Sequence, residues 1–275
     1  MSKLFKSDLQ SDPTDFIANK GFYIDIFHVN SGQNVKFKAM LEEFSDTFNS
    51  NYDEQYFVMQ TQPIRKWMNT TREISVSWKA VASGISEAKQ NMARVSMLTN
   101  MLFAEQEKTK DGMMITKAGG SPLFKVRLQN LIGAPGTDFG PAETAGQLGY
   151  IANFLYRFEM EQTGFLHAPS LKDNAVNAGR SIRRSELGQE NMVYPQVINL
   201  SFTFYPVYEK SPAWIRDESG EIKFNVNSVS GDKTKFPYGV ETDTVATRGN
   251  ISLPLKTQAA RDDAAASAKK ILGSG

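Results

Sequence analysis

The sequence contains no cysteine. A chain without thiols can form neither a disulfide framework nor a thiolate metal site, so both of these ways of holding a fold together are excluded. The absence fits a protein that matures in a reducing cytoplasm or that never relies on redox chemistry.

Histidine is scarce as well, with His28 and His167 as the two copies in the chain. Neither is accompanied by a second histidine or by a carboxylate at the spacing of a metal-ligand set. We therefore expect both histidines to be structural, and the sequence predicts no metal site and no cofactor.

An excess of charge of one sign is also missing, because 31 Lys and Arg side chains face 30 Asp and Glu side chains. The net charge of +1 does not indicate that the chain as a whole binds nucleic acid or anionic lipid. A local patch of basic residues is compatible with this net charge. No window approaches the roughly eighteen apolar residues of a membrane span. The N-terminal stretch MSKLFKSDLQSDPTDF reaches Asp, Ser and Pro before an apolar run of signal-peptide length. The sequence therefore predicts neither a membrane span nor a signal peptide.

A hydrophobic content of 40% over 275 residues is enough for a core, and residues 71–103 are its most regular part. They begin with the period of two that is typical of a half-buried strand. The period then changes to three or four residues, which predicts a helix over 86–103 with Ser86 as its N-cap and Glu87 in its first turn. The apolar stripe of this helix consists of Ala88, Met92, Val95, Leu98 and Leu102. We expect the apolar face of the strand (Ile74, Val76, Trp78), or its opposite face if the phase is shifted by one residue, to be buried against Val95, Leu98 and Leu102.

Five further stretches have the alternation of strands, namely residues 22–29, 35–39, 123–130, 148–160 and 197–207. Asn30-Ser31-Gly32 predicts a hairpin between the first two, because these residues tolerate positive φ. Residues 40–51 are interpreted as irregular, residues 105–120 as a surface loop, and the glycine-rich residues 133–149 as a long loop. The resulting fold class is mainly β (α+β), an antiparallel β domain over residues 21–208 with one helix.

Two polar arms flank this domain in the prediction. The N-terminal arm, residues 1–20, has a turn signal at Asp12-Pro13 and the apolar pair Phe16-Ile17 to dock it. The C-terminal arm, residues 209–275, is rich in Ser, Gly, Thr, Asp and Lys, and its alanine-rich residues 258–272 favour a short helix.

Seven residues are the interface candidates of the sequence. The first three, Arg180, Arg183 and Arg184, can pair bidentately with phosphate or with an acidic protein face, and a flexible loop without a single partner is an equally good interpretation. The other four are isolated aromatic anchors of the C-terminal arm. We expect that arm to lie across a neighbouring subunit as a clamp, so that a chain cut after Lys210 stays folded but does not assemble. The anchors are Trp214, Phe224, Phe236 and Tyr238.

No motif for catalysis stands out. The segment GAPGTDFG lacks the Gly-Lys-Ser/Thr ending of a phosphate-binding loop, and we interpret it as a plain loop. Glu42, Glu43 and Asp46 could form a carboxylate site, but a solvated acidic surface explains them better. The sequence therefore predicts a protein that is not an enzyme. An enzyme with a hidden site and a nucleic-acid or carbohydrate binding module are the alternatives from other classes.

Five separated blocks carry a resemblance to a family, over about residues 35–208. In chain order they are FKAMLEEFSDTFN, YFVMQTQPIRKWMNTTREISVSW, ISEAKQNMARVSMLTNMLF, SPLFKVRLQNLIG and YPQVINLSFTFYPVYE. Their order resembles that of the tail-tube-like proteins in the baseplates of contractile-tailed bacteriophages, in particular those that initiate the tail tube. The long polar C-terminal extension departs from an ordinary tube subunit.

The resemblance implies an antiparallel β-sandwich or barrel of the tail-tube type, flanked by one α-helix and assembled as a homohexameric ring. It implies a structural virion protein, assembled in the host cytoplasm, whose channel continues the inner tube for DNA. Its partners would be copies of itself and other baseplate, hub and tail-tube proteins, with DNA as transient cargo and no membrane. A main tail-tube subunit or a tail-completion protein is the alternative within the class. For such a channel we expect a neutral or acidic wall and weak binding of duplex DNA.

Overall fold

The computed structural model describes residues 13–56, 62–108, 113–116, 120–135, 137, 140–159, 164–167, 192–208, 212–216, 222–225 and 236–238. The chain divides into two compact units, Met1–Val240 and Glu241–Gly275, and every described residue belongs to the first. Arg180, Arg183, Arg184 and the alanine-rich residues 258–272 lie outside the described residues.

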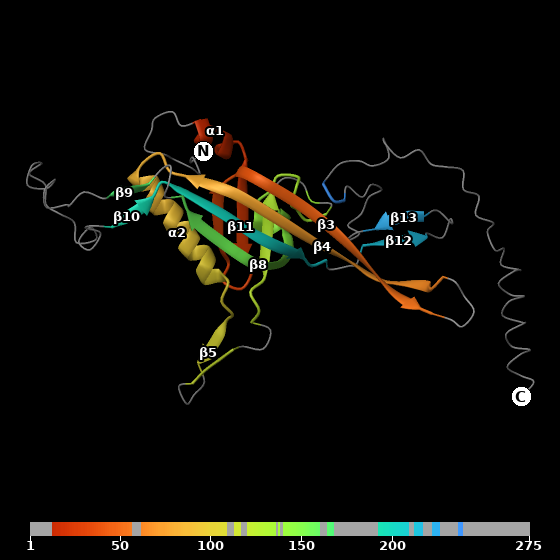
Figure 1. Ribbon diagram of the computed structural model, residues 1–275. Helices are drawn as coiled ribbons and strands as arrows, with labels where there is room; N and C mark the ends of the chain where they lie inside the picture. Colours follow the sequence, from red (N-terminus) through yellow and green to blue (C-terminus); the bar gives the residue numbers. More distant parts are fainter. Residues whose placement is uncertain are drawn as a thin grey trace, which may run out of the picture. The chain divides into compact units, whose positions relative to one another are not determined.

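Seven antiparallel strands form the central sheet, in the order β2-β1-β7-β8-β11-β4-β3 (Figure 1). The β1–β2 turn contains Gly32 at φ +66°, so the predicted hairpin is confirmed. The strands are β1 (Tyr23–His28), β2 (Gln33–Lys38), β3 (Met40–Gln55), β4 (Ile64–Val81), β7 (Phe124–Leu128), β8 (Gln147–Phe158) and β11 (Val197–Pro206).

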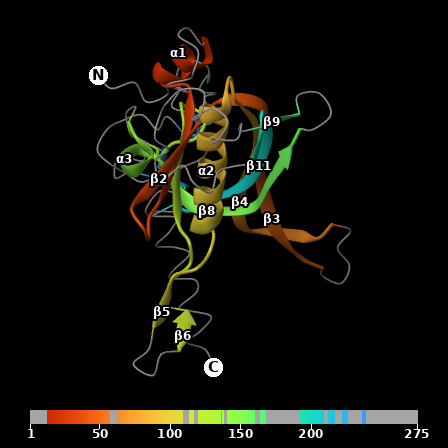
Figure 2. The ribbon, with the colours of Figure 1, turned by 90° about the vertical axis from the view of Figure 1, so that its left-hand side faces the viewer.

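The sheet folds over on itself. In a flat sheet, β2 and β4 would lie about 24 Å apart, because five steps of about 4.8 Å separate them. The rings of Phe37 on β2 and Trp78 on β4 are instead 5.5 Å apart, centroid to centroid. The curvature of the strands around the helix is visible in Figure 2. The sequence prediction of a mainly β, antiparallel fold with one long helix is confirmed.

Helix α2 (Ile85–Met101) closes the core from one side of the sheet. The predicted packing is confirmed, since one apolar cluster contains the strand face of β4 together with Val95 and Leu98. Leu102 packs against that cluster while partly buried. The buried strand face consists of Ile74, Val76 and Trp78.

The predicted N-cap of α2 is wrong. Gly84 occupies the cap position, and no side chain caps the helix there. Glu87 instead reaches back from the first turn, where its Oε2 accepts hydrogen bonds from the backbone N and the Oγ of Ser83, at 2.8 and 2.7 Å. Its Oε1 accepts a hydrogen bond from Lys38, 2.5 Å away, which ties the helix to β2. A buried lysine that needs a carboxylate explains why Glu87 is buried at the helix start.

Three segments interpreted as irregular contain regular structure. Residues 40–51 belong to β3, because pairing with β4 satisfies a strand whose own composition is polar. Residues 105–120 contain the hairpin of β5 (Gln106–Lys108) and β6 (Met114–Thr116). The glycine-rich loop contains the single turn α3 (Ala142–Ala145), where the backbone N of Ala142 donates to Asp25 Oδ2 at 3.0 Å. The contact of α3 is distant in sequence, whereas β5 and β6 pair with each other within a short hairpin.

Both predicted arms contain short elements. The N-terminal helix α1 (Pro13–Asn19) buries Ala18 and leaves Phe16 and Ile17 exposed, so the expected docking through that pair is wrong. The C-terminal part holds β12 (Ala213–Arg216) and β13 (Ile222–Asn225), which pair with each other. A further pair is formed by β9 (Phe165–His167) and β10 (Val193–Pro195).

Among the described residues, no helix has the length and apolar character that crossing a membrane requires.

Candidate interaction surface on the β3–β4 ribbon

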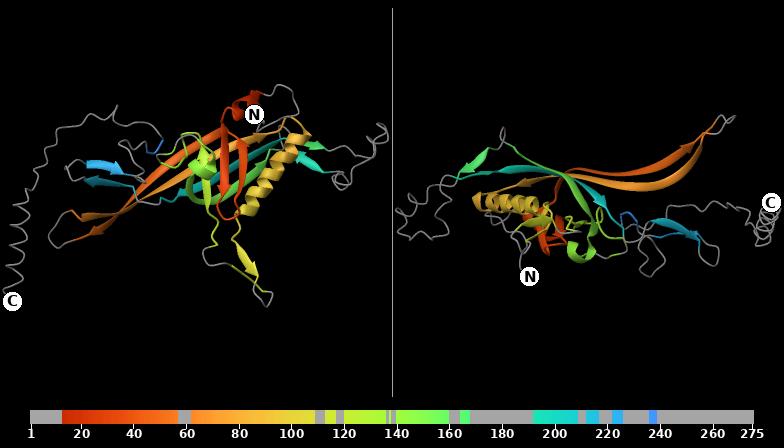
Figure 3. Two further views of the ribbon diagram at one scale, coloured as in Figure 1. Left: turned by 180° about the vertical axis from the view of Figure 1, so that it is seen from behind. Right: turned by 90° about the horizontal axis from the view of Figure 1, so that it is seen from below.

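Strands β3 and β4 run on together past the other strands of the sheet (Figures 1 and 3). Residues 74–79 of β4 pair with β3 on one side and with β11 on the other. Residues 64–73 pair with β3 alone. We call this two-stranded part, residues 47–55 and 64–73, the ribbon. A two-stranded ribbon is marginally stable in water unless something packs on it, so its side chains are the first place to look for a partner.

The ribbon has an aromatic face and a polar face. The aromatic face continues the core side of the sheet and carries Phe48, Ser50, Tyr52 and Glu54 of β3 with Arg65, Trp67, Thr70 and Arg72 of β4. The polar face carries Thr47, Asn49, Asn51, Asp53 and Gln55 of β3 with Ile64, Lys66, Asn69, Thr71 and Glu73 of β4. This asymmetry follows the period of two of a strand and gives the ribbon one face suited to burial.

A β-bulge sets which face Trp67 occupies. Asn51 pairs with Asn69, but the next residue, Tyr52, pairs with Trp67, so Met68 is the extra residue. The shift brings the indole to the face of Thr70, and Trp67 Nε1 donates to Thr70 Oγ1 at 3.1 Å. Bulges re-aim side chains in this way, and here the result is an indole held by a hydrogen bond on the aromatic face.

At the base of the ribbon the aromatic face is covered around a buried ion pair. Arg72 donates from Nε and Nη2 to the carboxylate of Asp46, at 2.9 and 2.6 Å, and both side chains are at most 5% exposed. Burial, the largest single cause, lowers the pKa of Arg72, but the hydrogen bonds and charges of Asp46 and Tyr208 together outweigh it and the pKa is raised. The guanidinium lies between two rings, 5.2 Å from the centroid of Phe48 and 5.4 Å from that of Phe236.

The C-terminal segment supplies this cover. Tyr238 donates its hydroxyl to Asp46 Oδ2 at 3.0 Å, and Tyr208 accepts a hydrogen bond from Arg72 Nη1 at 3.1 Å. Burial raises the pKa of both tyrosine hydroxyls. The ring of Phe236 lies 5.9 Å from that of Tyr208, centroid to centroid. We call Asp46, Phe48, Arg72, Tyr208, Phe236 and Tyr238 the base cluster.

The four aromatic anchors predicted in the C-terminal arm do come together. Phe224 lies 5.8 Å from Phe236 and 5.3 Å from Trp214, ring centroid to ring centroid. Phe236 and Tyr238, however, dock on this chain's own ribbon, which corrects the expectation that they lie across a neighbour. The acidic-surface interpretation of Asp46 is also wrong, since Arg72 neutralises it in a buried site. A buried Arg–Asp pair between two strands leaves no signal in a single sequence.

At the tip of the ribbon a second cross-strand ion pair is open to solvent. Arg65 Nε donates to Glu54 Oε1 at 2.8 Å, and the Arg65 side chain is 66% exposed. Tyr56 donates its hydroxyl to Glu54 Oε2 at 2.9 Å. The hydrogen bond from Tyr56, and then the charge of Arg65, lower the pKa of Glu54. We call Tyr52, Glu54, Tyr56, Arg65 and Trp67 the tip cluster; its three aromatic residues are all more than half exposed.

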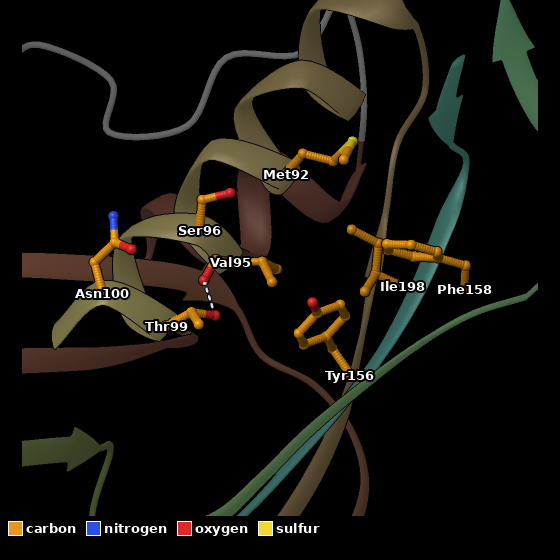
Figure 4. Close-up of a pocket in the computed structure, with 8 residues that line it drawn as sticks. All are labelled: Met92, Val95, Ser96, Thr99, Asn100, Tyr156, Phe158 and Ile198. Atoms are coloured by element: carbon orange, nitrogen blue, oxygen red, sulfur yellow. Dashed lines mark hydrogen bonds between the residues drawn. The ribbon is translucent and has the colours of Figure 1, made fainter. Parts of the chain in front are cut away.

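A small pocket lies between α2 and the sheet (Figure 4). Its volume of about 200 Å³ is below the roughly 300 Å³ at which small-molecule sites begin. Thr99 Oγ1 donates to the carbonyl of Val95 at 2.9 Å, and Tyr156 is the one titratable side chain of the lining. The lining consists of Met92, Val95, Ser96, Thr99, Asn100, Tyr156, Phe158 and Ile198. The size of the pocket therefore gives it no support as a small-molecule site.

The remaining sequence candidates do not form a reactive site in the described part of the chain. His28 is buried beside Phe124, and its Nδ1 is 2.8 Å from Ser31 Oγ. Glu42 pairs with Lys79 at 2.9 Å. Within those same residues, no group of three or more His, Asp or Glu side chains is placed to hold a metal ion.

Docking of the C-terminal segment on the ribbon leads to a testable difference between two truncations. A chain that ends at Lys210 loses Phe236 and Tyr238 from the base cluster, whereas a chain that ends at Val240 keeps them. We expect the shorter chain to melt at a lower temperature, with a loss of about 1 to 3 kcal/mol, because the buried Asp46 carboxylate loses a hydrogen bond and its cover. Thermal unfolding of the two chains measures the difference, and equal midpoints would contradict the docking.

Comparison with known proteins assigns no family. No protein-family model matches the chain, and no curated protein is significantly similar to it.

Proposed function

We propose that this protein is a structural subunit of a contractile phage tail, which forms a hexameric ring in the baseplate and initiates or continues the inner tube. The resemblance of five sequence blocks supports the choice of family. The observation that carries a structural role is the state of the sheet edges. In the described residues, no strand pairs with the outer edge of β2 or of β3. An unpaired edge exposes backbone N–H and C=O groups, which can pair with a strand of a neighbouring chain.

An assembly experiment with paired proline variants tests this proposal. Successive backbone N–H groups of a strand point to opposite edges, so one of Asn49→Pro and Ser50→Pro removes a donor toward β4 and the other removes a donor toward the free edge. The free-edge variant is the one whose melting temperature is unchanged. We expect wild-type protein to form six-membered rings in native mass spectrometry and negative-stain images, and we expect the free-edge variant to stay monomeric.

Different outcomes separate the alternatives. Open-ended tubes instead of single rings would favour a main tail-tube subunit. The ring would be contradicted if the wild-type protein and both proline variants stayed monomeric at all concentrations.

One observation favours a second candidate, a nucleic-acid or carbohydrate binding module. The exposed aromatic residues Tyr52, Tyr56 and Trp67 lie along one face of the ribbon, as a stacking platform requires. The opposite charges of Glu54 and Arg65 make this platform electrically balanced, which disfavours a polyanion. Tight binding of DNA with a steep salt dependence, or of an oligosaccharide, would replace the structural proposal.

A further inference from the structure

The base cluster and the tip cluster repeat one chemical pattern along the aromatic face. Each contains an arginine of β4 bound to a carboxylate of β3, Arg72 with Asp46 and Arg65 with Glu54. In each, the same carboxylate also accepts a tyrosine hydroxyl, from Tyr238 at the base and from Tyr56 at the tip. The two clusters thus share an arginine, a carboxylate and a tyrosine hydroxyl, and the base cluster adds Tyr208, which accepts a hydrogen bond from Arg72.

The clusters differ most in the aromatic cover of the arginine. At the base, the guanidinium of Arg72 lies between two rings, one from the ribbon and one, Phe236, from the docked segment. At the tip, no described ring lies over the guanidinium of Arg65, and its side chain is 66% exposed against 5% for Arg72. The tip cluster lacks the counterpart of Phe236.

The side chains of the tip are also held in place before any partner arrives. Trp67 is oriented by the hydrogen bond that its Nε1 donates to Thr70 Oγ1. Thr70 Oγ1 also lies 3.0 Å from Ser50 Oγ. Arg65 is fixed by its bond to Glu54. Tyr, Trp and Arg in fixed positions are the residues that contribute most to protein interfaces, because little conformational entropy is lost when they bind.

We propose that the tip cluster binds an aromatic side chain carried on an extended segment of a partner protein, with its ring stacked on the guanidinium of Arg65 and beside Trp67. The same mode of recognition occurs within this chain at the base cluster, where Phe236 covers Arg72 on the same face of the ribbon. The segment lies along the aromatic face as the C-terminal residues lie at the base. This surface does not depend on the ring proposal, since it is a property of one chain.

A peptide-binding measurement with the full-length protein tests the inference. The probe is a fluorescent octapeptide with the sequence of residues 233–240, KTKFPYGV, and the control peptide is KTKAPAGV. We expect the probe to bind wild-type protein and the control peptide not to bind. The double variant Arg65→Ala/Trp67→Ala should bind the probe about tenfold more weakly or worse. Lys66→Ala, between the two positions but on the polar face, should bind as wild type does.

Thermal melts of the variants show whether the fold is intact, since these exposed residues lie outside the core. Arg65→Lys keeps the charge but loses the planar stacking surface, so it should bind more weakly than wild type. Unchanged binding in the double variant would mean that the probe displaces the chain's own segment at the base, and the proposal would be wrong. Absence of binding at millimolar probe would also overturn it. The proposal would also be overturned if the wild-type protein did not bind the probe but self-associated, and the double variant abolished that self-association.

Discussion

Replacing Arg72 by alanine should lower the free energy of unfolding by about 3 to 5 kcal/mol, because it leaves the buried Asp46 carboxylate without its counter-ion. Asp46 is 3% exposed, and the partner that it keeps is the hydroxyl of Tyr238. The docked segment should loosen with it, since Phe236 loses the guanidinium on which it stacks. Urea unfolding measures the stability, and a change in tryptophan emission that a Trp214→Phe background lacks reports the segment, because Trp214 contacts Phe224.

The matched control is Arg65→Ala on the same ribbon. It removes an arginine from a cross-strand pair of the same chemistry that is open to solvent, and the unfolding midpoint should not change measurably. The double variant Arg72→Met/Asp46→Leu removes both buried charges and should recover most of the stability. If Arg72→Ala and Arg65→Ala had the same midpoint, the base cluster would not be buried as described.

Replacing Leu98 by alanine should cost about 2 to 5 kcal/mol, because the side chain is fully buried between α2 and the sheet. The lost stability combines the transfer free energy of the removed atoms with the cavity that they leave. The transition midpoint in urea should fall while the slope of the free energy stays the same, since the surface exposed on unfolding hardly changes.

Leu155 of β8 provides the control for Leu98. It is the same residue type but 45% exposed, so Leu155→Ala should have a much smaller effect. An unchanged midpoint for Leu98→Ala would remove α2 from the core and with it the packing of the whole strand–helix unit.

The strand–helix unit and most of the central sheet were predictable because their information is local. Alternation in residues 71–81 and the three-to-four period after Gly84 place apolar side chains on one face whatever the rest of the chain does. The hairpin at Gly32 follows from a residue that tolerates positive φ. The N-cap was predicted at Ser86 because serine favours that position. In the structure, Glu87 instead binds Ser83 and Lys38, and its contact with Lys38 is not local in sequence.

Hydrophobic periodicity was enough to predict a mainly β, antiparallel protein with one long helix on its core, because each residue contributes to that pattern locally. The ribbon and its two clusters depend instead on tertiary contacts. Residues 40–55 are too polar to signal a strand, and pairing with β4 makes them one. Asp46 and Tyr238 are separated by most of the chain, and their hydrogen bond exists because the C-terminal segment returns to the ribbon. Contacts of that kind depend on where the fold brings distant residues together, which no local pattern encodes.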